Sequence, residues 1–397
     1  MTAAHPTALL LGVDTPIGLA VIRDLGRHGV PVHGVGRTPR ALGRASRYLT
    51  GFSLRRAGPL ADWLPALVAK TGAVAVFAIA EHDLLALADL RDAVPGCHVL
   101  TPAAGPLRKV LDKSVTLAVA LEVGIDVPES IQPDTPDVRP ASYPVVLKWA
   151  DPAAADVKLA QHGIRMLKAE FCRDATELTQ ALTRYVPVGI FPLVQSYCPG
   201  FGLGQMLHMA EGRATLRFQH ERIHEWPPEG GVSTWCRAIP SDRHAAQMEK
   251  SEALLCALDW QGPAMVEYRY DPSRQAYKLM EVNGRFWGSQ PLAVHSGAYF
   301  AWEAYRRAVL GEESPALLPS SELEARFLVP DTRRLLRLLF NRGSIADPLF
   351  QATPLADAAK WLGGFVDPRV KGYLWDWRDP APALADVANM ALKLAGR

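Results

Sequence analysis

Strand-like and helix-like segments alternate through the first hundred residues, and this rhythm restricts the fold more than any other feature of the sequence. From Ala8 the chain gives a short apolar strand, ALLLGV, then a turn, the periodic stretch LAVIRDLGRHG and a second strand, VPVHGVG. The apolar strand AVAVFAIA and the helical LLALADL continue the pattern. Because strands that alternate with helices favour a parallel, doubly wound sheet, we expect a Rossmann-like α/β domain over residues 1–105.

The turn after the first strand runs from Gly12 to Gly18 and matches a dinucleotide-binding fingerprint only in part. Its central glycine is missing, and Arg37 follows Gly36 where that fingerprint needs an acidic residue for the ribose. We therefore interpret it as a plain Rossmann-like turn rather than an NAD(P) site.

A polar cluster, Glu81, His82 and Asp83, directly follows a later strand of this region. The carboxyl ends of parallel strands are where the ligands of α/β folds gather, so Glu81 and His82 are predicted to contact a substrate. The simpler alternative is that these acids stabilise the N-terminus of a helix.

The charge balance and the cysteines exclude several classes of protein. Lys plus Arg number 43 against 41 Asp plus Glu, so the chain has no electrostatic footprint for nucleic acid. Its five cysteines form no C-x-x-C pair, which suits reduced thiols in a cytoplasm. The N-terminus has no leader pattern and no apolar run reaches membrane-spanning length. We therefore expect a cytoplasmic protein that binds neither nucleic acid nor membrane, and a homodimer stays open.

A proline-rich stretch, QPDTPDVRPASYP, ends at Pro144 and separates the alternating region from a different pattern. After it, the strand PVVLKWA carries a single lysine, Lys148, and LVQSYC gives another strand over residues 193–198. The segments QMLHMA and ATLRFQ flank a Glu-Gly-Arg turn and predict a hairpin. Since strands and helices now mix without the βαβ rhythm, we expect α+β domains, followed by helices in the C-terminal part.

The segment KLMEVNGRFWGS places Glu281, Asn283 and Arg285 at every second position, so a strand would point all three side chains to one face. Upstream, MVEYRYDPSRQAY contains the turn DPSRQ, and a hairpin through this turn sets Glu267 opposite Glu281. Two carboxylates and an amide oxygen are hard ligands that suit Mg²⁺, and an arginine can stabilise phosphoryl charge or clamp a carboxylate. An exposed strand with solvated charges is the alternative at this point.

Four motifs resemble, in this order, those of the ATP-grasp superfamily, and within it the carbamoyl-phosphate-synthase-like carboxylate–amine ligases. They are LDKSVTLAVALEVGIDVPES, PVVLKW, LVQSYCPGFGLG, and the pair MVEYR and LMEVNGRFWGS. The likeness covers roughly residues 1–312. Each motif alone is a weak signal, whereas four in the family's order form a strong one.

The resemblance implies a role for each motif. Lys113 would bind the nucleotide phosphates, Lys148 would reach the α and β phosphates of ATP, and Arg285 would serve the reacting phosphate or carboxylate. The other implied contacts are the ligands of Mg²⁺ (or Mn²⁺), Glu267, Glu281 and Asn283, and the residues along adenine, Gln195, Ser196, Tyr197 and Cys198. Phosphoryl transfer needs positioned charge more than covalent catalysis, and this set supplies it.

The resemblance also implies the domain order. The Rossmann-like pre-ATP-grasp domain would be followed by a small, lid-bearing subdomain over 106–192, a metal-binding lobe over 193–312 and a helical extension over 313–397. Two departures from the family pattern concern ATP, since DPAAADVKLAQHG replaces the glycine-rich lid and Gln195 replaces a glutamate but keeps an acceptor for the adenine amino group. The basic, amphipathic TRRLLRLLFNR in the extension is expected to pack on the ligase body rather than on a membrane.

Residues 220–224, HERIH, match the zinc-protease signature H-E-x-x-H. That signature needs a helix, which would bring His220 and His224 about 6 Å apart. The alternating ATLRFQ before it predicts a strand, on which the two would lie about 13 Å apart, so we do not expect a zinc site. The family likeness makes the stretch a loop bordering the active site, with Arg222 as a substrate or phosphate contact or else a solvated surface residue.

The expected function is that of an ATP-dependent carboxylate–amine ligase. ATP would phosphorylate a carboxylate to an acyl phosphate with release of ADP, and an amine would then displace phosphate to form an amide. A carboxylating or thiol-ligating relative and a catalytically silent nucleotide-binding module stay open as alternatives. The motifs leave the small-molecule carboxylate and amine unspecified, since loops build the substrate pockets of such folds.

Overall fold

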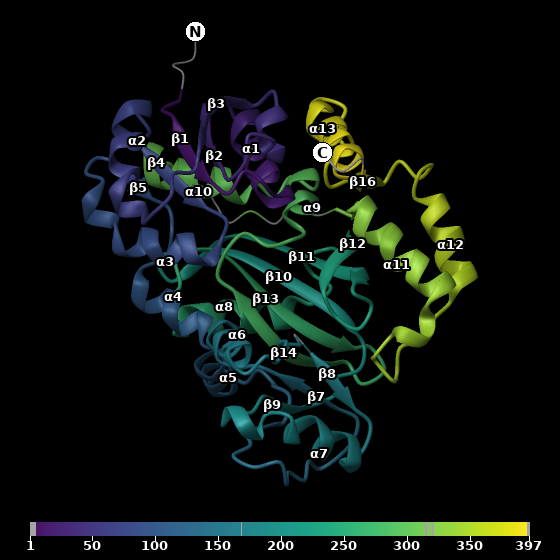
Figure 1. Ribbon diagram of the computed structural model, residues 1–397. Coiled ribbons are helices and arrows are strands. Elements are labelled where there is room, and N and C mark those ends of the chain that lie inside the picture. Colours follow the sequence, from purple (N-terminus) through teal and green to yellow (C-terminus); the bar gives the residue numbers. More distant parts are fainter. Residues whose placement is uncertain (1–4, 168, 314–316, 318, 320, 395–397) are drawn as a thin grey trace.

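The computed structural model describes residues 5–167, 169–313, 317, 319 and 321–394 and is built around three β-sheets (Figure 1). Residues 1–4 of the first predicted domain and 395–397 of the predicted extension lie outside the described residues. In the view of Figure 1 the first sheet is at the top, the largest sheet is in the middle and the smallest is at the bottom.

The first sheet is parallel, with the strand order β3-β2-β1-β4-β5, as expected from the alternating sequence. Its elements are β1 (Ala8–Leu11), α1 (Pro16–Arg27), β2 (Val32–Gly36), β3 (Leu49–Leu54), α2 (Leu64–Thr71), β4 (Ala75–Ala78), α3 (Glu81–Asp89) and β5 (His98–Val99). Leu9 and Leu11 share a buried core with α2 and α3, while Ala8 and Leu10 share another with α1. Helices therefore cover both faces of this sheet.

A helix pair and a four-stranded antiparallel sheet follow, with the order β6-β9-β7-β8. The elements are α4 (Ala104–Leu111), α5 (Lys113–Glu122), β6 (Ser130–Ile131), β7 (Val145–Lys148), α6 (Pro152–Gln161), β8 (Glu170–Cys172), α7 (Ala175–Thr183) and β9 (Leu193–Ser196). The glycine-poor segment DPAAADVKLAQHG forms α6, because Asp151 caps the helix through a 3.0 Å bond from the Ala154 amide and alanine favours helix.

The central sheet has seven strands in the order β14-β13-β10-β11-β12-β15-β16. Its main elements are β10 (Phe201–Ala210), β11 (Arg213–Trp226), β12 (Val232–Ala238), α8 (Ala245–Ala257), β13 (Gly262–Asp271), β14 (Ala276–Asn283), α9 (Gln290–His295) and α10 (Phe300–Leu310). Both predicted hairpins are confirmed. The turn between β10 and β11 consists of Glu211 and Gly212, whose φ angles of 53° and 74° are those of a two-residue hairpin turn.

The C-terminal part is not purely helical, which corrects the expected extension. Besides α11 (Leu328–Phe340), α12 (Pro354–Gly363) and α13 (Ala381–Leu394) it contains β15 (Glu324–Arg326) and β16 (Val370–Gly372). These two strands lengthen the central sheet beyond β12. Three-residue strands are too short to give an alternating pattern, so sequence periodicity could not reveal them.

Two expectations from composition can be compared with the structure. All five cysteines are free thiols, in agreement with the reduced state expected. Among the helices of the described residues, none combines the length and apolar character that crossing a membrane requires.

The C-terminal part returns to the first domain, where residues 374–379 meet α1 and α13 packs on the turn Leu42–Ala45, so α13 lies beside that domain in Figure 1. The Arg23 guanidinium meets the Asp379 carboxylate at 3.0 Å, and both side chains are almost fully buried. Arg23 also donates to the carbonyl oxygen of Leu374 at 2.8 Å, and Ser46 Oγ donates to Asp379 at 2.7 Å. The buried charge pair is therefore satisfied on several sides.

We expect Asp379→Ala to destabilise the protein by about 3 kcal/mol, because it leaves the buried Arg23 charge without its partner. Urea unfolding followed by circular dichroism measures the change. Asp367→Ala, which removes an exposed ion pair with Arg369 in the same extension, is the control and should leave the unfolding midpoint unchanged. Equal midpoints for wild type and Asp379→Ala would contradict the role given to this pair.

Candidate active site

The hairpin β13–β14 brings together the predicted metal ligands. Glu267 and Glu281 are direct cross-strand partners, so their side chains leave the same face of the sheet. Asn283, two residues further on, donates its amide N–H to Glu281 Oε1 at 3.1 Å. The predicted acidic and amide side chains are thus neighbours in space.

Two lysines from distant segments reach this hairpin. Lys113 is the first residue of α5, held there by the Asp112 cap, and its Nζ lies 3.4 Å from Glu281 Oε2. Lys148 ends β7, and its Nζ lies 4.0 Å from the sulfur of Met280. Met280 sits at a bulge between the paired residues of the hairpin. The two predicted phosphate-binding lysines therefore converge on the predicted metal ligands.

The titration behaviour of this cluster follows from burial and from the neighbouring charges. Burial, and secondly the nearby Lys113 ammonium, lower the pKa of Lys148. Burial acts to raise the pKa of Glu281, but Lys113 and the Asn283 amide outweigh it and the net shift is downward. Burial raises the pKa of Glu267 to about 7, although the Arg222 guanidinium acts against it. Loss of solvation therefore dominates at Glu267, even though Arg222 pairs with it.

Arg222 of β11 is buried at the hairpin, so the solvated-surface alternative is wrong. It pairs with Glu267, donates to Glu225 at 3.1 Å and to the Gly231 carbonyl at 3.2 Å, and its side chain is only 12% exposed. Gly202 on the neighbouring strand leaves room for it, because a Cβ there would lie 2.6 Å from Arg222 Cδ. The stretch around Arg222 is strand, not the loop that we expected.

Glu81 and His82 lie at the start of α3, where the first domain faces the hairpin. Arg285 Nε donates to Glu81 Oε1 at 2.9 Å, which joins the two domains, and His82 Nε2 lies 3.1 Å from an Arg37 nitrogen. No side chain caps α3 after Ala80, but Glu81 and Asp83 lie in its first turn, where acids stabilise a helix N-terminus, so the simpler alternative also agrees with the structure. Both predicted substrate contacts border the same region as Arg285.

Sequence reasoning missed other charged residues along this edge of the first sheet. The Asp14 carboxylate accepts the backbone N–H of Arg37 at 3.0 Å, and Arg55 pairs with Asp83 at 2.7 Å. Asp14, Arg37 and Arg55 follow β1, β2 and β3 closely, as ligand-binding residues of parallel sheets do. Their positions directly after predicted strands were the feature of the sequence that could have identified them.

The predicted adenine segment forms the end of β9 and the residues after it. Gln195 is buried and donates its amide N–H to Ser130 Oγ at 3.0 Å, so this nitrogen faces β6. Ser196 donates its backbone N–H to the Glu129 carbonyl at 2.8 Å. Cys198 Sγ lies 3.6 Å from the Ser196 carbonyl, and the Tyr197 hydroxyl lies 3.2 Å from an Asp347 oxygen. The Tyr197 contact ties this segment to the C-terminal extension and was not anticipated.

The HERIH stretch lies within β11, as its alternation predicted. His220 Nε2 lies 3.2 Å from Ser289 Oγ, whereas His224 Nδ1 lies 2.7 Å from Asp331, so the two histidines have separate partners. Burial lowers the pKa of His220 to about 3. Within the described part of the chain, no three side chains of the His, Cys, Asp or Glu type are grouped to hold a metal ion.

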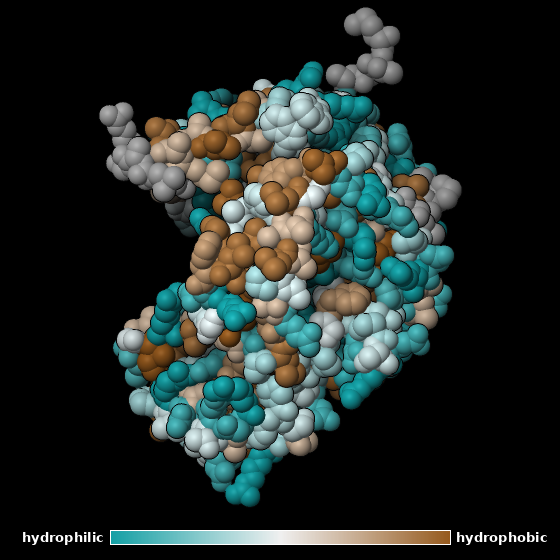
Figure 2. Space-filling model, turned by 90° about the vertical axis from the view of Figure 1, so that its right-hand side faces the viewer, coloured by the Kyte–Doolittle hydropathy of each residue, from teal (hydrophilic) through white to brown (hydrophobic). Residues whose placement is uncertain are grey.

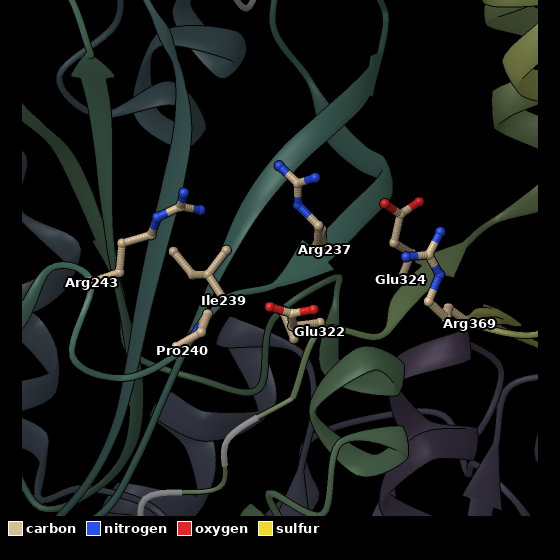
Figure 3. Close-up of a pocket in the computed structure, with 8 residues that line it drawn as sticks. Arg237, Ile239, Pro240, Arg243, Glu322, Glu324 and Arg369 are labelled. Carbon is tan, nitrogen blue, oxygen red and sulfur yellow. The ribbon is translucent and has the colours of Figure 1, made fainter.

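One cavity, of about 320 Å³, lies away from the hairpin and is shown in Figure 3. Arg237, Arg243 and Arg369 line it, together with Glu322 and Glu324. Each arginine already has an acidic neighbour outside the lining, which is Glu221 for the first two and Asp367 for the third. The charges of this cavity are therefore balanced, and it offers no unpaired cation to an anionic ligand.

A second cavity, of about 410 Å³, lies between the end of the first domain, β10 and α10, and is likewise remote from the hairpin. The space-filling view shows, in addition, a hollow at mid-height between the upper and lower parts of the molecule (Figure 2). In that view the hollow opens to the left.

Solved structures give the comparison with known proteins. No protein-family model and no curated protein matches the chain. N5-carboxyaminoimidazole synthetase from Staphylococcus aureus is 13% identical over 88% of this chain and 90% of its own, with a TM-score of 0.64. L-amino acid ligase from Bacillus licheniformis is 16% identical over 79% and 78%, with a TM-score of 0.55. Biotin carboxylase from Campylobacter jejuni is 12% identical over 77% and 71%, with a TM-score of 0.60. At these identities the likeness establishes a common fold.

Because His220 and His224 are held by different partners on a strand, we expect the purified protein to contain no stoichiometric zinc. His220→Ala and His224→Ala should then have the same metal content as the wild type. Mass spectrometry of metals in protein purified without chelators measures this. One equivalent of zinc in the wild type that is lost in both variants would overturn the interpretation and support a zinc hydrolase.

Proposed function

The chain has the ATP-grasp fold, as its four motifs predicted, and from this premise we propose that it is an ATP-dependent carboxylate–amine ligase. It would form an acyl phosphate from a carboxylate and ATP, release ADP, and join the acyl group to an amine. The observation that carries the proposal is the convergence of Lys113, Lys148 and Arg222 on the paired carboxylates Glu267 and Glu281. A solvated surface strand has no reason to attract partly buried cations from three separate segments.

The neighbours in fold support a nucleotide as one substrate. The Staphylococcus aureus synthetase has also been solved as a complex with ADP, and the Campylobacter jejuni biotin carboxylase as a complex with an ATP compound. We extend nucleotide binding to this chain because its two lysines lie where charge for phosphates is needed. Lys148 has a lowered pKa at this position, and phosphate oxygens would favour its charged form.

The donor set of the hairpin fits a divalent cation. Glu267, Glu281 and Asn283 offer oxygen ligands of the kind that Mg²⁺ or Mn²⁺ binds. Burial raises the pKa of Glu267, and a divalent cation bound beside it would favour its charged form. When bound, such an ion neutralises phosphate charge during phosphoryl transfer. Arg222 holds the Glu267 carboxylate in place on the other side.

Arg285 and Glu81 would act on the substrates. Arg285 presents a planar fork that can clamp a carboxylate, and its ion pair with Glu81 keeps it at the face of the first domain. Glu81 and His82 are partly exposed, so both are accessible to a small molecule. In the first step a carboxylate oxygen bonds to the γ-phosphorus as the bond to ADP breaks. In the second step the amine nitrogen bonds to the acyl carbon, phosphate leaves with the bonding electrons, and the nitrogen loses a proton.

The direct test is release of ADP by the purified protein with Mg²⁺ and a panel of amino acids and other carboxylates, each with and without added amines. Release that depends on both a carboxylate and an amine supports the ligase. Release that depends on bicarbonate or a thiol instead points to the carboxylating or thiol-ligating alternative. No release with any carboxylate, together with measurable ATP binding, would leave a silent nucleotide-binding module.

Lys113→Ala and Lys148→Ala are each expected to weaken ATP binding at least about tenfold, because each removes a charge-assisted contact to phosphate. Isothermal titration calorimetry with ATP and Mg²⁺ measures the affinity. Lys109→Ala, at an exposed lysine of α4, is the control and should bind ATP as the wild type does. If both site variants bind ATP with wild-type affinity, the nucleotide assignment is wrong.

Glu281→Gln should slow turnover at least about a hundredfold, since it removes a charged metal ligand that stabilises the transition state. Arg285→Lys keeps the positive charge but loses the planar fork, so turnover should fall strongly while ATP affinity changes little. Steady-state ADP release at saturating ATP, compared with calorimetric affinity, separates these effects. Glu249→Gln on α8 is exposed and serves as the control. A Glu281→Gln enzyme as fast as the wild type would refute the assignment.

A further inference from the structure

The outer surface of the C-terminal extension carries an unusual concentration of exposed hydrophobic side chains. Among the described residues, 13 large hydrophobic residues between positions 328 and 387 are exposed, against eight in the rest of the chain. Figure 2 views the molecule from the side that carries α11 and α12 in Figure 1, and hydrophobic side chains are gathered on this side. Isolated exposed hydrophobic residues are normal in monomers, whereas a concentration of this kind marks an interaction site.

In α12 the usual amphipathic arrangement is inverted. Asp357 is buried against the body, where it meets Arg334 at 2.8 Å, and Lys360, although exposed, leans toward the body so that its Nζ lies 5.5 Å from the Trp235 ring. Leu355 and Leu362 point outward, and their exposed fractions are 84% and 62%. A surface helix of a monomer normally shows the opposite polarity.

Two neighbouring segments continue the hydrophobic surface. On α11, Asp331 and Arg334 are buried, while Leu336, Leu339 and Phe340 are exposed. Directly after α12, Phe365 and Val366 are exposed as well. We define the apolar face as Leu336, Leu339, Phe340, Leu355, Leu362, Phe365 and Val366. The packing of α11 against α12 makes it one surface.

The area of the apolar face matches what a stable dimer needs. Its seven side chains are 40% to 84% exposed, which corresponds to on the order of 800 Å² for residues of this size. A standard interface buries about 800 Å² on each partner. The largest patch on a typical monomer is smaller, at about 300–600 Å². The face is therefore large enough for a specific protein interface.

We infer that the apolar face is the interface of a symmetric homodimer. The outward surface of α12 presents Leu355, Ala359 and Leu362, and its one exposed charge, Lys360, lies beside the Trp235 ring, so little charge opposes the approach of a second copy. A twofold axis beside the middle of α12, close to Ala359, would pair Leu355 of each copy with Leu362 of the other, and twofold dimers are the commonest assemblies of soluble chains. Helices that bind membrane surfaces are rich in Lys and Arg on their polar face, whereas α12 carries a single lysine, Lys360.

Sedimentation velocity tests the inference with the full chain. The wild type should sediment with twice the monomer mass of 43.3 kDa at micromolar concentration. The double variant Leu355→Asp/Leu362→Asp should dissociate, with its dimerisation weakened at least about a hundredfold. Leu121→Asp, at a leucine of α5 that is 59% exposed and lies outside the apolar face, is the matched control and should remain dimeric. Both changes in the double variant lie on the surface, so circular dichroism should show an intact fold.

An engineered cysteine gives a second, independent measurement. Ala359 lies on the exposed side of α12 between the two leucines, so Ala359→Cys should form an intermolecular disulfide under mild oxidation, whereas the wild type should not. A monomeric wild type at 50 µM, or a dimer that survives Leu355→Asp/Leu362→Asp, would overturn the inference. A monomer that cosediments with anionic lipid vesicles would overturn it in favour of a membrane-binding surface.

Discussion

The paired carboxylates Glu267 and Glu281 are the constraint around which the rest of the structure is arranged. Two acids facing each other across neighbouring strands repel unless cations reach them. The chain supplies these cations from segments that are far apart in sequence, with Lys113 from a helix start, Lys148 from a strand end and Arg222 from the next hairpin. Bringing such segments to one hairpin requires the four-stranded sheet and the central sheet to face each other. The paired carboxylates therefore fix how these two sheets are placed relative to one another.

Much of this arrangement could be predicted from the sequence because it rests on local rules. A two-residue period and a turn were sufficient to place Glu267 opposite Glu281, and the order of four motifs predicted the fold. Tertiary contacts could not be anticipated in the same way. The burial of Arg222 depends on the room left by Gly202 on a neighbouring strand, and the Arg285–Glu81 pair depends on how two domains meet. The strands β15 and β16 exist only because they pair with the edge of the sheet.

The helices α11 and α12 bury part of their charge and expose several hydrophobic side chains. His224 of the central sheet lies 2.7 Å from Asp331, while Arg334 and Asp357 complete a buried polar group between α11, α12 and the sheet. Burying such a polar group costs free energy unless every member has a hydrogen-bond partner. Its contacts therefore fix the orientation of α11 and α12 on the sheet more than they stabilise the packing. Polar contacts therefore set the direction in which α11 and α12 present their hydrophobic sides.

The contact between Tyr197 and Asp347 has a mechanical consequence. It links the segment after β9, in the lobe that carries the four-stranded sheet, to the connector between α11 and α12, across 150 residues of chain. A swing of the lobe away from the central sheet must break this hydrogen bond or pull the connector along, at a cost on the order of 1 kcal/mol. The extension is thus mechanically coupled to the small sheet, and in the proposed ligase the release of ADP would depend on a residue far from the β13–β14 hairpin.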